Sequence, residues 1–260
     1  MSSDIFKVMM LGDMIGEPGV SDVVVKIGSL RNKEKLNLIV VNGENSDKGF
    51  GITEEIVLKL KQAGVDVITT GNHVWSNRDH EKLLADYASL LRPANYPSAP
   101  GKGFIVLQIN GIEVAVVNLQ GRYSMIPIDC PFQVLSKLLK NELKKSDIII
   151  VDFHAEYSAE KKTLAVQFDG KVSLVAGTHT HVQTADETIL KNGTGFITDL
   201  GICGGLDSII GMEKDGVIEK ILSQSNVPFV PSRENIKIQG IIAEIDKNTK
   251  RAISIKRLSI

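Results

Sequence analysis

Short β-branched runs alternate with amphipathic segments along this chain. The runs predict strands over Lys7–Leu11, Leu36–Val41, Val65–Thr70, Ile148–Phe153, Ser173–Ala176 and Phe196–Thr198. The segments between them predict helices over Val20–Arg31, Glu54–Ala63, Phe132–Lys144 and Ser158–Phe168. Such alternation is typical of an α/β protein in which helices cover the faces of a largely buried sheet.

Two predicted hairpins interrupt this alternation. Gly103–Ile109 and Glu113–Asn118 are joined through Asn110-Gly111, a pair that supplies the positive φ angles of a type I′ turn. Lys237–Ile245 and Ala252–Leu258 form the second hairpin. Antiparallel strands beside βα units predict mixed sheets, so a purely parallel doubly wound fold is disfavoured.

The chain is predicted to form one domain over residues 1–260. Its 260 residues, 43% of them hydrophobic and 23% charged, suffice for one large buried core, although two small domains would also fit this length. No internal repeat or low-complexity linker divides the sequence. Residues 75–100, which end in a stretch containing several prolines, are predicted to form a small lid.

Charge, hydropathy and cysteine content narrow the partners. With 30 basic and 31 acidic residues the formal net charge is −1, so extended nucleic-acid binding is not expected. No apolar run approaches the roughly 20 residues that span a bilayer, and the N-terminus lacks the pattern of a signal peptide. The two cysteines, Cys130 and Cys203, are too few for a disulfide framework and are expected to be reduced thiols. We therefore expect a cytoplasmic protein that binds no membrane.

Polar side chains follow most of the predicted strands. Since functional sites in open α/β sheets form beyond the carboxyl ends of strands, these side chains are expected to converge. Four of the five histidines lie in these exits; each alone could be an ordinary hydrogen-bonded residue, but together they predict a metal centre. The fifth, His80, lies in a charged stretch and is interpreted as a solvated surface residue. The exit residues are Asp13, Glu44, Asn45, Asn72, His73, His154, His179 and His181.

The ligand chemistry of these residues suits two divalent ions. Imidazole and carboxylate donors without thiolates favour manganese, iron, zinc or cobalt over a structural zinc site. The two oxygens of Glu44 could bridge two ions at the roughly 3.5–4 Å separation found in two-metal hydrolases. Asp13 and Glu44 would neutralise two of the four positive charges and a bridging hydroxide a third. The net positive charge that is left would attract a phosphoester.

The order of these motifs resembles that of the calcineurin-like metallophosphoesterases. Gly71-Asn72-His73 matches the third block of that signature, and His179-Thr180-His181 matches the last. Ile15 stands where a histidine is usual, and Glu44 where an aspartate is usual. These departures make the chain similar to the YmdB group of bacterial metallophosphoesterases over nearly its full length. The similarity extends to residues 92–97, 118–122, 154–156, 177–187 and 207–211, whereas residues 201–205 depart from the pattern.

This resemblance implies a fold and a set of roles. The fold is a four-layer α/β/β/α sandwich of two mixed sheets. His73 would protonate the leaving oxygen or stabilise the transition state, with a purely hydrogen-bonding role as the alternative. The implied ligands are Asp13, Glu44, Asn45 and His181 for one ion, and Glu44, Asn72, His154 and His179 for the other.

The resemblance also implies an activity, the hydrolysis of 2′,3′-cyclic nucleotides by attack of a metal-bridging hydroxide. Iron or manganese would be the metals, with zinc or cobalt as alternatives. A phosphomonoesterase or nucleotidase is the nearest alternative, and its dianionic substrate would need a basic clamp such as Arg92 or Arg122. A regulatory protein that binds nucleotide or RNA without turnover is the third, although the complete ligand set argues against it. The expected partner is a small nucleotide phosphoester, and a homo-oligomer stays open.

Overall fold

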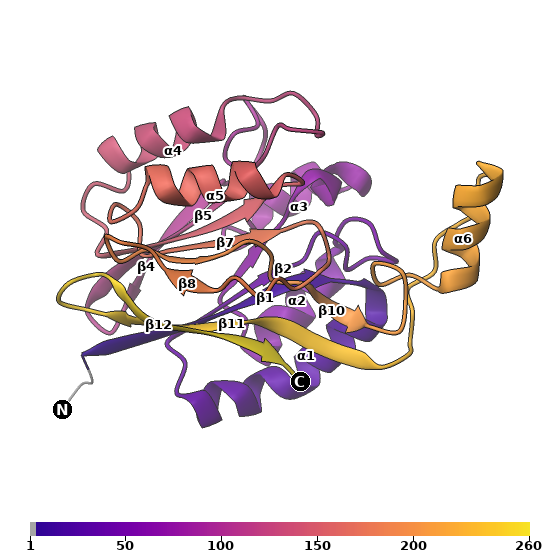
Figure 1. Cartoon of the computed structure of the whole chain (residues 1–260), viewed down its shortest axis with the longest axis horizontal. Coiled ribbons are helices and arrows are strands. Elements are labelled where there is room, and N and C mark those ends of the chain that lie inside the picture. The colour runs from indigo at the N-terminus through magenta and orange to yellow at the C-terminus, as the bar shows by residue number, and fades with distance from the viewer. Residues whose placement is uncertain (1–3) are drawn as a thin grey trace.

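Two six-stranded mixed sheets pack face to face at the centre of the molecule (Figure 1). The structure is a computed structural model that describes residues 4–260. The first sheet has the strand order β12-β11-β10-β1-β2-β3, and β11 also pairs with β1; the second has the order β4-β5-β6-β7-β9-β8. The strands of the first sheet are β1 (Ile5–Met14), β2 (Leu38–Asn42), β3 (Val67–Thr69), β10 (Ile202–Gly205), β11 (Ile236–Asp246) and β12 (Ala252–Ser259). Those of the second are β4 (Phe104–Ile109), β5 (Ile112–Gln120), β6 (Ile148–His154), β7 (Leu174–Thr178), β8 (Thr188–Ile189) and β9 (Gly195–Ile197).

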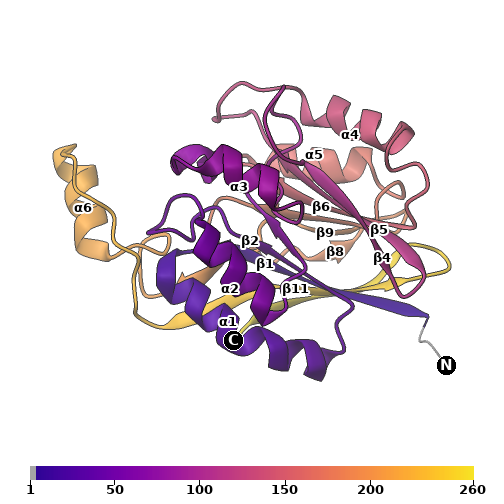
Figure 2. The ribbon, with the colours of Figure 1, turned by 180° about the vertical axis from the view of Figure 1, so that it is seen from behind.

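Helices cover the outer face of each sheet (Figures 1 and 2). Helices α1 and α2 lie on the first sheet, and α4 and α5 lie on the second. The layers therefore follow the order α/β/β/α, and the predicted fold class is confirmed. The helices are α1 (Gly16–Glu34), α2 (Glu54–Ala63), α3 (His80–Asp86), α4 (Pro131–Lys140), α5 (Ser158–Gln167) and α6 (Lys214–Ser223), with a 3₁₀ helix η1 (Asn72–Ser76).

Strand β1 shows why the central strands carry apolar residues at successive positions. Val8 and Met10 belong to the core between the two sheets, whereas Met9 and Leu11 pack in the core beneath α1 and α2. Successive side chains of a strand point to opposite faces, so a strand covered on both sides needs apolar residues at every position. The short β-branched runs of the sequence are such strands.

Both predicted hairpins are present and make the sheets mixed. Asn110 and Gly111, with φ angles of 52° and 80°, form the turn between the antiparallel strands β4 and β5. Strands β11 and β12 form the second antiparallel pair. The remaining central strands run parallel: β1 with β2 and β10, β2 with β3, and β5 through β6 and β7 to β9. Their carboxyl ends carry the loops that form the site described below.

Helices α3 and α6, strands β8 and β10, and the 3₁₀ helix η1 were not predicted. Helix α3 packs Leu83 and Leu84 into the core that lies between the first sheet and its helices. This helix falls within residues 75–100, and the small lid predicted there stays a prediction. Helix α6 projects away from the body in both views, and the chain that returns from it brings Phe229 against a small apolar cluster that includes Met212. Within residues 4–260, none of the helices combines the length and apolar character needed to cross a bilayer.

The two cysteines provide a test of this packing. Cys203 lies in β10 in the core, where burial raises the pKa of its thiol, whereas Cys130 is only partly buried. A buried thiol without an accessible thiolate reacts slowly. In the native protein we expect a thiol-specific chromogenic disulfide to modify Cys130 and to leave Cys203 unmodified. The native Cys130→Ser variant should show almost no reaction until denaturant is added, and rapid reaction of that native variant would contradict the fold.

Candidate metal centre

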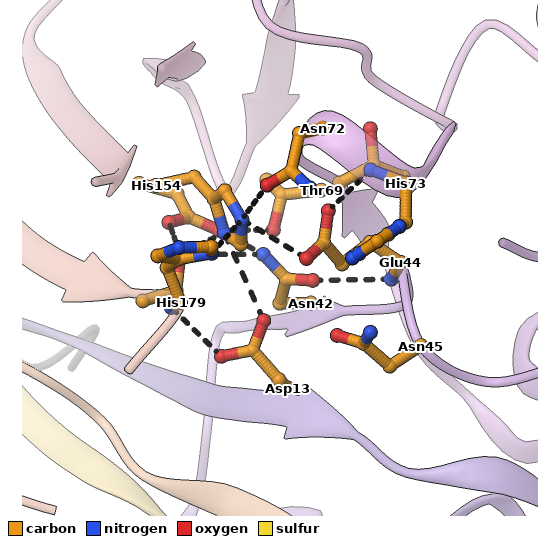
Figure 3. A network of polar contacts seen from close by, with 12 residues as sticks. Asp13, Asn42, Glu44, Asn45, Thr69, Asn72, His73, His154 and His179 are labelled. Carbon is orange, nitrogen blue, oxygen red and sulfur yellow. Dashed lines mark hydrogen bonds and ion pairs between the residues drawn. The ribbon is translucent and has the colours of Figure 1, made fainter. Parts of the chain in front are cut away.

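The predicted metal-binding residues lie at the carboxyl ends of strands from both sheets (Figure 3). From the first sheet, Asp13 lies in β1, Glu44 follows β2 and Asn72 follows β3. From the second, His154 ends β6 and His179 directly follows β7. Single ligand atoms of Glu44, His154 and His179 all lie within 4.8 Å of one another, as a metal site requires.

His154 presents an unprotonated nitrogen to this cluster. Thr178 donates its hydroxyl proton to Asp152 over 2.8 Å, and the Thr178 oxygen lies 2.9 Å from His154 Nδ1. Nδ1 therefore carries the ring proton and donates it to Thr178, which leaves a lone pair on Nε2. Nε2 lies 2.9 Å from Glu44 Oε1, 3.1 Å from Asn72 Oδ1 and 3.0 Å from His179 Nδ1. These electron-rich atoms repel one another unless a cation lies between them.

Three buried oxygens in the site lack a hydrogen-bond partner among the described residues: Asp13 Oδ1, Glu44 Oε1 and Asn45 Oδ1. The other polar atom of each side chain is engaged. Asp13 Oδ2 accepts the N–H of His179 (3.1 Å), Glu44 Oε2 accepts the N–H of His73 (3.0 Å), and Asn45 Nδ2 donates to the Gly49 carbonyl (2.8 Å). Since buried polar atoms are normally paired, oxygens that are held in place but left unpaired fit metal ligands.

Burial sets the protonation of the cluster. It raises the pKa of Asp13 well above its ordinary value, and the negative charges of Glu44 and Asp199 raise it further. Burial also raises the pKa of Glu44. The pKa of His154 is lowered well below its ordinary value, and that of His179 is lowered to about 3, in both cases chiefly by burial. Neutral imidazole is the form that binds metals, and a cation would stabilise the buried carboxylates, so the donor set fits divalent metal ions.

A strained turn carries His179 and His181. Their φ angles are 101° and 65°, in the left-handed region that residues other than glycine rarely adopt. Asp199 holds the turn, because its Oδ2 accepts both the backbone N–H (3.1 Å) and the hydroxyl (2.8 Å) of Thr180. His181 Nδ1 lies 2.9 Å from the Ile210 carbonyl and donates to it, so its Nε2 remains available to a metal. The turn therefore presents both imidazoles to the site.

Residues that sequence reasoning missed hold these ligands in place. Asp152 orients His154 through Thr178, and Lys161, which is completely buried, forms a 2.7 Å ion pair with Asp199. Asp152 had a signal in the sequence: it is the one charged residue in the run Ile148–Phe153, two positions before His154 and so on the same face of the strand. Lys161 and Asp199 are 38 positions apart and had no such signal.

A cavity of about 410 Å³ opens onto the ligands. Glu44, Asn45, His179 and His181 line it together with His73, the predicted proton donor. His80 lies outside the cavity. It is half-buried against the Trp75 ring, with 5.4 Å between the ring centroids, so it is less exposed than the solvated surface residue that was expected.

Comparison with known proteins identifies the family to which this chain belongs. A family model described as YmdB-like protein matches residues 9–258. The chain belongs to the YmdB-like family. Glu44 and Ile15, the departures from the wider metallophosphoesterase signature, indicated this group from the sequence, and that prediction is confirmed.

Relatives in this family cover almost the whole chain. A Bacillus subtilis (strain 168) protein named 2′,3′-cyclic-nucleotide 2′-phosphodiesterase is 40% identical over 255 residues, which cover 98% of this chain and 97% of that protein. The crystal structure of a hypothetical protein from Thermus thermophilus matches with a TM-score of 0.90 and 36% identity, covering 98% of this chain and 99% of that one. A crystal structure described as a novel phosphatase from Mycoplasma pneumoniae matches with a TM-score of 0.92 and 34% identity, covering 98% and 93%.

A substitution at Gly71 of this YmdB-like chain tests how tightly the candidate ligands are packed. A Cβ atom at this position would overlap the His154 ring and Glu44 Oε2. We expect Gly71→Ala to lower the affinity for a divalent metal by about 10- to 100-fold, the usual cost of disturbing a metal's supporting residues. Metal content and titration by calorimetry measure it. Gly28→Ala is the matched control, because a Cβ at Gly28 has no neighbour within 4 Å. Equal affinities of the two variants would contradict the packed site.

A substitution in the buried Lys161–Asp199 pair tests whether this pair stabilises the turn that carries His179 and His181. Lys161→Met leaves the Asp199 carboxylate buried without its cation, which typically costs about 3–5 kcal/mol. We expect this loss in the free energy of unfolding, measured by urea denaturation. Lys82→Met removes an exposed lysine that pairs with Asp86 and should change stability little. If Lys161→Met is as stable as Lys82→Met, the pair does not support the turn.

Proposed function

We propose that this protein is a dinuclear-metal phosphodiesterase that hydrolyses nucleoside 2′,3′-cyclic phosphates. The observation that most strongly supports this proposal is the convergence of three unpaired buried oxygens with the Nε2 lone pair of His154. A site with these donors concentrates positive charge from metals at the mouth of a cavity, where an anionic phosphoester can bind. The name of the Bacillus subtilis relative supports the substrate.

The proposed ligands form two sets that share Glu44. Glu44 has one oxygen fixed by the His73 N–H and the other free, and it is assigned the bridging role. One ion would be held by Asp13, Glu44, Asn45 and His181, and the other by Glu44, Asn72, His154 and His179. Bound divalent ions supply Lewis-acid stabilisation of the phosphoryl oxygens and a nucleophile from water.

His73 is the proposed proton donor to the leaving ribose oxygen. Its ring lines the cavity, its backbone N–H is tied to Glu44, and its ring packs edge-on against Phe50 with 4.9 Å between centroids. These contacts hold the imidazole beside the ligands while leaving it open to substrate. Asn45 and Asn72 contribute oxygen donors without cancelling metal charge, which keeps the site attractive to an anion.

The cavity favours a diester over a monoester. Among the described residues, neither a lysine nor an arginine is part of its lining. Arg92, one candidate clamp, donates to the carbonyls of Pro93, Ala99 and Pro100 and so serves the loop around it. Arg122, the other, is exposed and is not part of the lining. A dianionic monoester would lack the basic clamp that such a substrate usually needs.

The proposed metals are iron or manganese, with zinc or cobalt as alternatives, since nitrogen and oxygen donors without thiolates suit all four.

Cys130 and Cys203 are free thiols, which supports the proposed cytoplasmic location. The substrate is a small nucleotide, and a homo-oligomer remains compatible with this proposal.

The proposal is tested by hydrolysis of adenosine 2′,3′-cyclic phosphate, beside a chromogenic diester and a chromogenic monoester, with manganese or iron added. We expect wild type to prefer the diesters. Glu44→Ala should lose both metal content and turnover. His73→Ala should keep its metal and lose about 10²- to 10⁴-fold in rate, the usual contribution of general acid catalysis.

His80→Ala is the matched histidine control and should retain the wild-type rate, because His80 lies outside the cavity. Preference for the monoester would instead favour a phosphomonoesterase. Tight nucleotide binding without turnover by the metal-loaded protein would favour a binding-only regulatory role and would reject the enzymatic proposal.

A further inference from the structure

An aromatic wall faces the proposed metal ligands across the cavity. Phe50 and Phe229 line the cavity, and their rings lie nearly parallel, at 16°, with 6.3 Å between centroids. The edge contact between Phe50 and His73 places this wall one side chain away from the proposed reacting centre. Ile210 and Met212 complete the apolar side of the cavity. These apolar side chains are not among the proposed metal ligands or proton donors.

Contacts outside the cavity anchor both residues. Phe50 sits on the turn that also orients Asn45, since its N–H donates to the Asp47 carbonyl (2.9 Å) and Asn45 donates to the carbonyl of Gly49. Lys220 Nζ lies 4.2 Å from the centroid of the Phe229 ring. Phe50 nevertheless keeps 38% of its surface exposed beside a charged site. A partly exposed apolar ring at the edge of a polar cavity is suited to a flat, weakly polar group.

We infer that Phe50 and Phe229 form a stacking site for the nucleobase of the substrate, an inference that rests on the proposed function. In a nucleoside 2′,3′-cyclic phosphate the base and the phosphate are attached to the same ribose. A phosphate at the ligands therefore carries its base to the adjacent wall. Every base has a π-face, so stacking on aromatic rings tolerates all four bases. The site accordingly selects base-bearing cyclic phosphates and discriminates little among the bases.

The test compares adenosine 2′,3′-cyclic phosphate with ribose 2′,3′-cyclic phosphate, which has the same reacting group and no base. Wild type should have a KM for the adenosine substrate lower by at least about 5-fold, the smaller end of the effect of one base–aromatic stack. Phe229→Leu keeps apolar volume but loses the π-face, so it should raise the KM for the adenosine substrate towards that for the ribose substrate. It should leave kcat and the ribose KM unchanged. Phe229→Tyr keeps a ring and should restore the low KM.

Phe50→Leu should raise the same KM; any disturbance of His73 would lower kcat for both substrates equally and is thereby separated. Tyr123→Leu alters a stacked aromatic pair that is not part of the cavity lining and should behave as wild type. Equal KM values of wild type for the two substrates, or equal shifts of both in Phe229→Leu, would overturn the base site and leave the phosphodiesterase intact. Turnover of neither substrate by the metal-loaded protein would overturn the proposed function and this inference together.

Discussion

Asp152 is completely buried between the two sheets and accepts hydrogen bonds from both of them. Thr69 and Asn42 donate from β3 and β2 of the first sheet, and Thr178 donates from β7 of the second. Burial raises the pKa of Asp152 to about 6, which still leaves the carboxylate ionised at neutral pH. A buried carboxylate is costly unless such donors satisfy it. The two sheets are therefore tied together at the edge where the candidate ligands lie.

This interaction has a chemical consequence as well as a structural one. Because Thr178 gives its proton to Asp152, it can only accept from His154, and the ring tautomer of His154 follows. The unprotonated Nε2 then faces Glu44, which comes from the other sheet, and lies 3.0 Å from His179 Nδ1. The sheet interface and the candidate metal-binding nitrogen depend on the same carboxylate.

A second buried charge supports the other half of the site. Lys161 on α5 neutralises Asp199, and Asp199 in turn holds the turn in which His179 and His181 adopt positive φ angles. Backbone strain persists only where the surroundings fix it, and here a buried ion pair and the bond from His179 N–H to Asp13 do so. The polar atoms of the site are thus positioned from both sheets and from a covering helix.

The sequence by itself determined the central strands other than β10, the two hairpins and the helices α1, α2, α4 and α5, because apolar periodicity and turn chemistry are local properties. It also identified the polar strand exits, since a strand's end is visible in its own residues. It missed α3 and α6, which are short or carry much exposed apolar surface, such as Leu222. Only the tertiary structure decided which oxygens are left unpaired, which tautomer His154 adopts and which rings face the ligands. These depend on atoms such as those of Asn42, Asp152 and Thr178, which meet only when two sheets pack, and no local pattern encodes such distances.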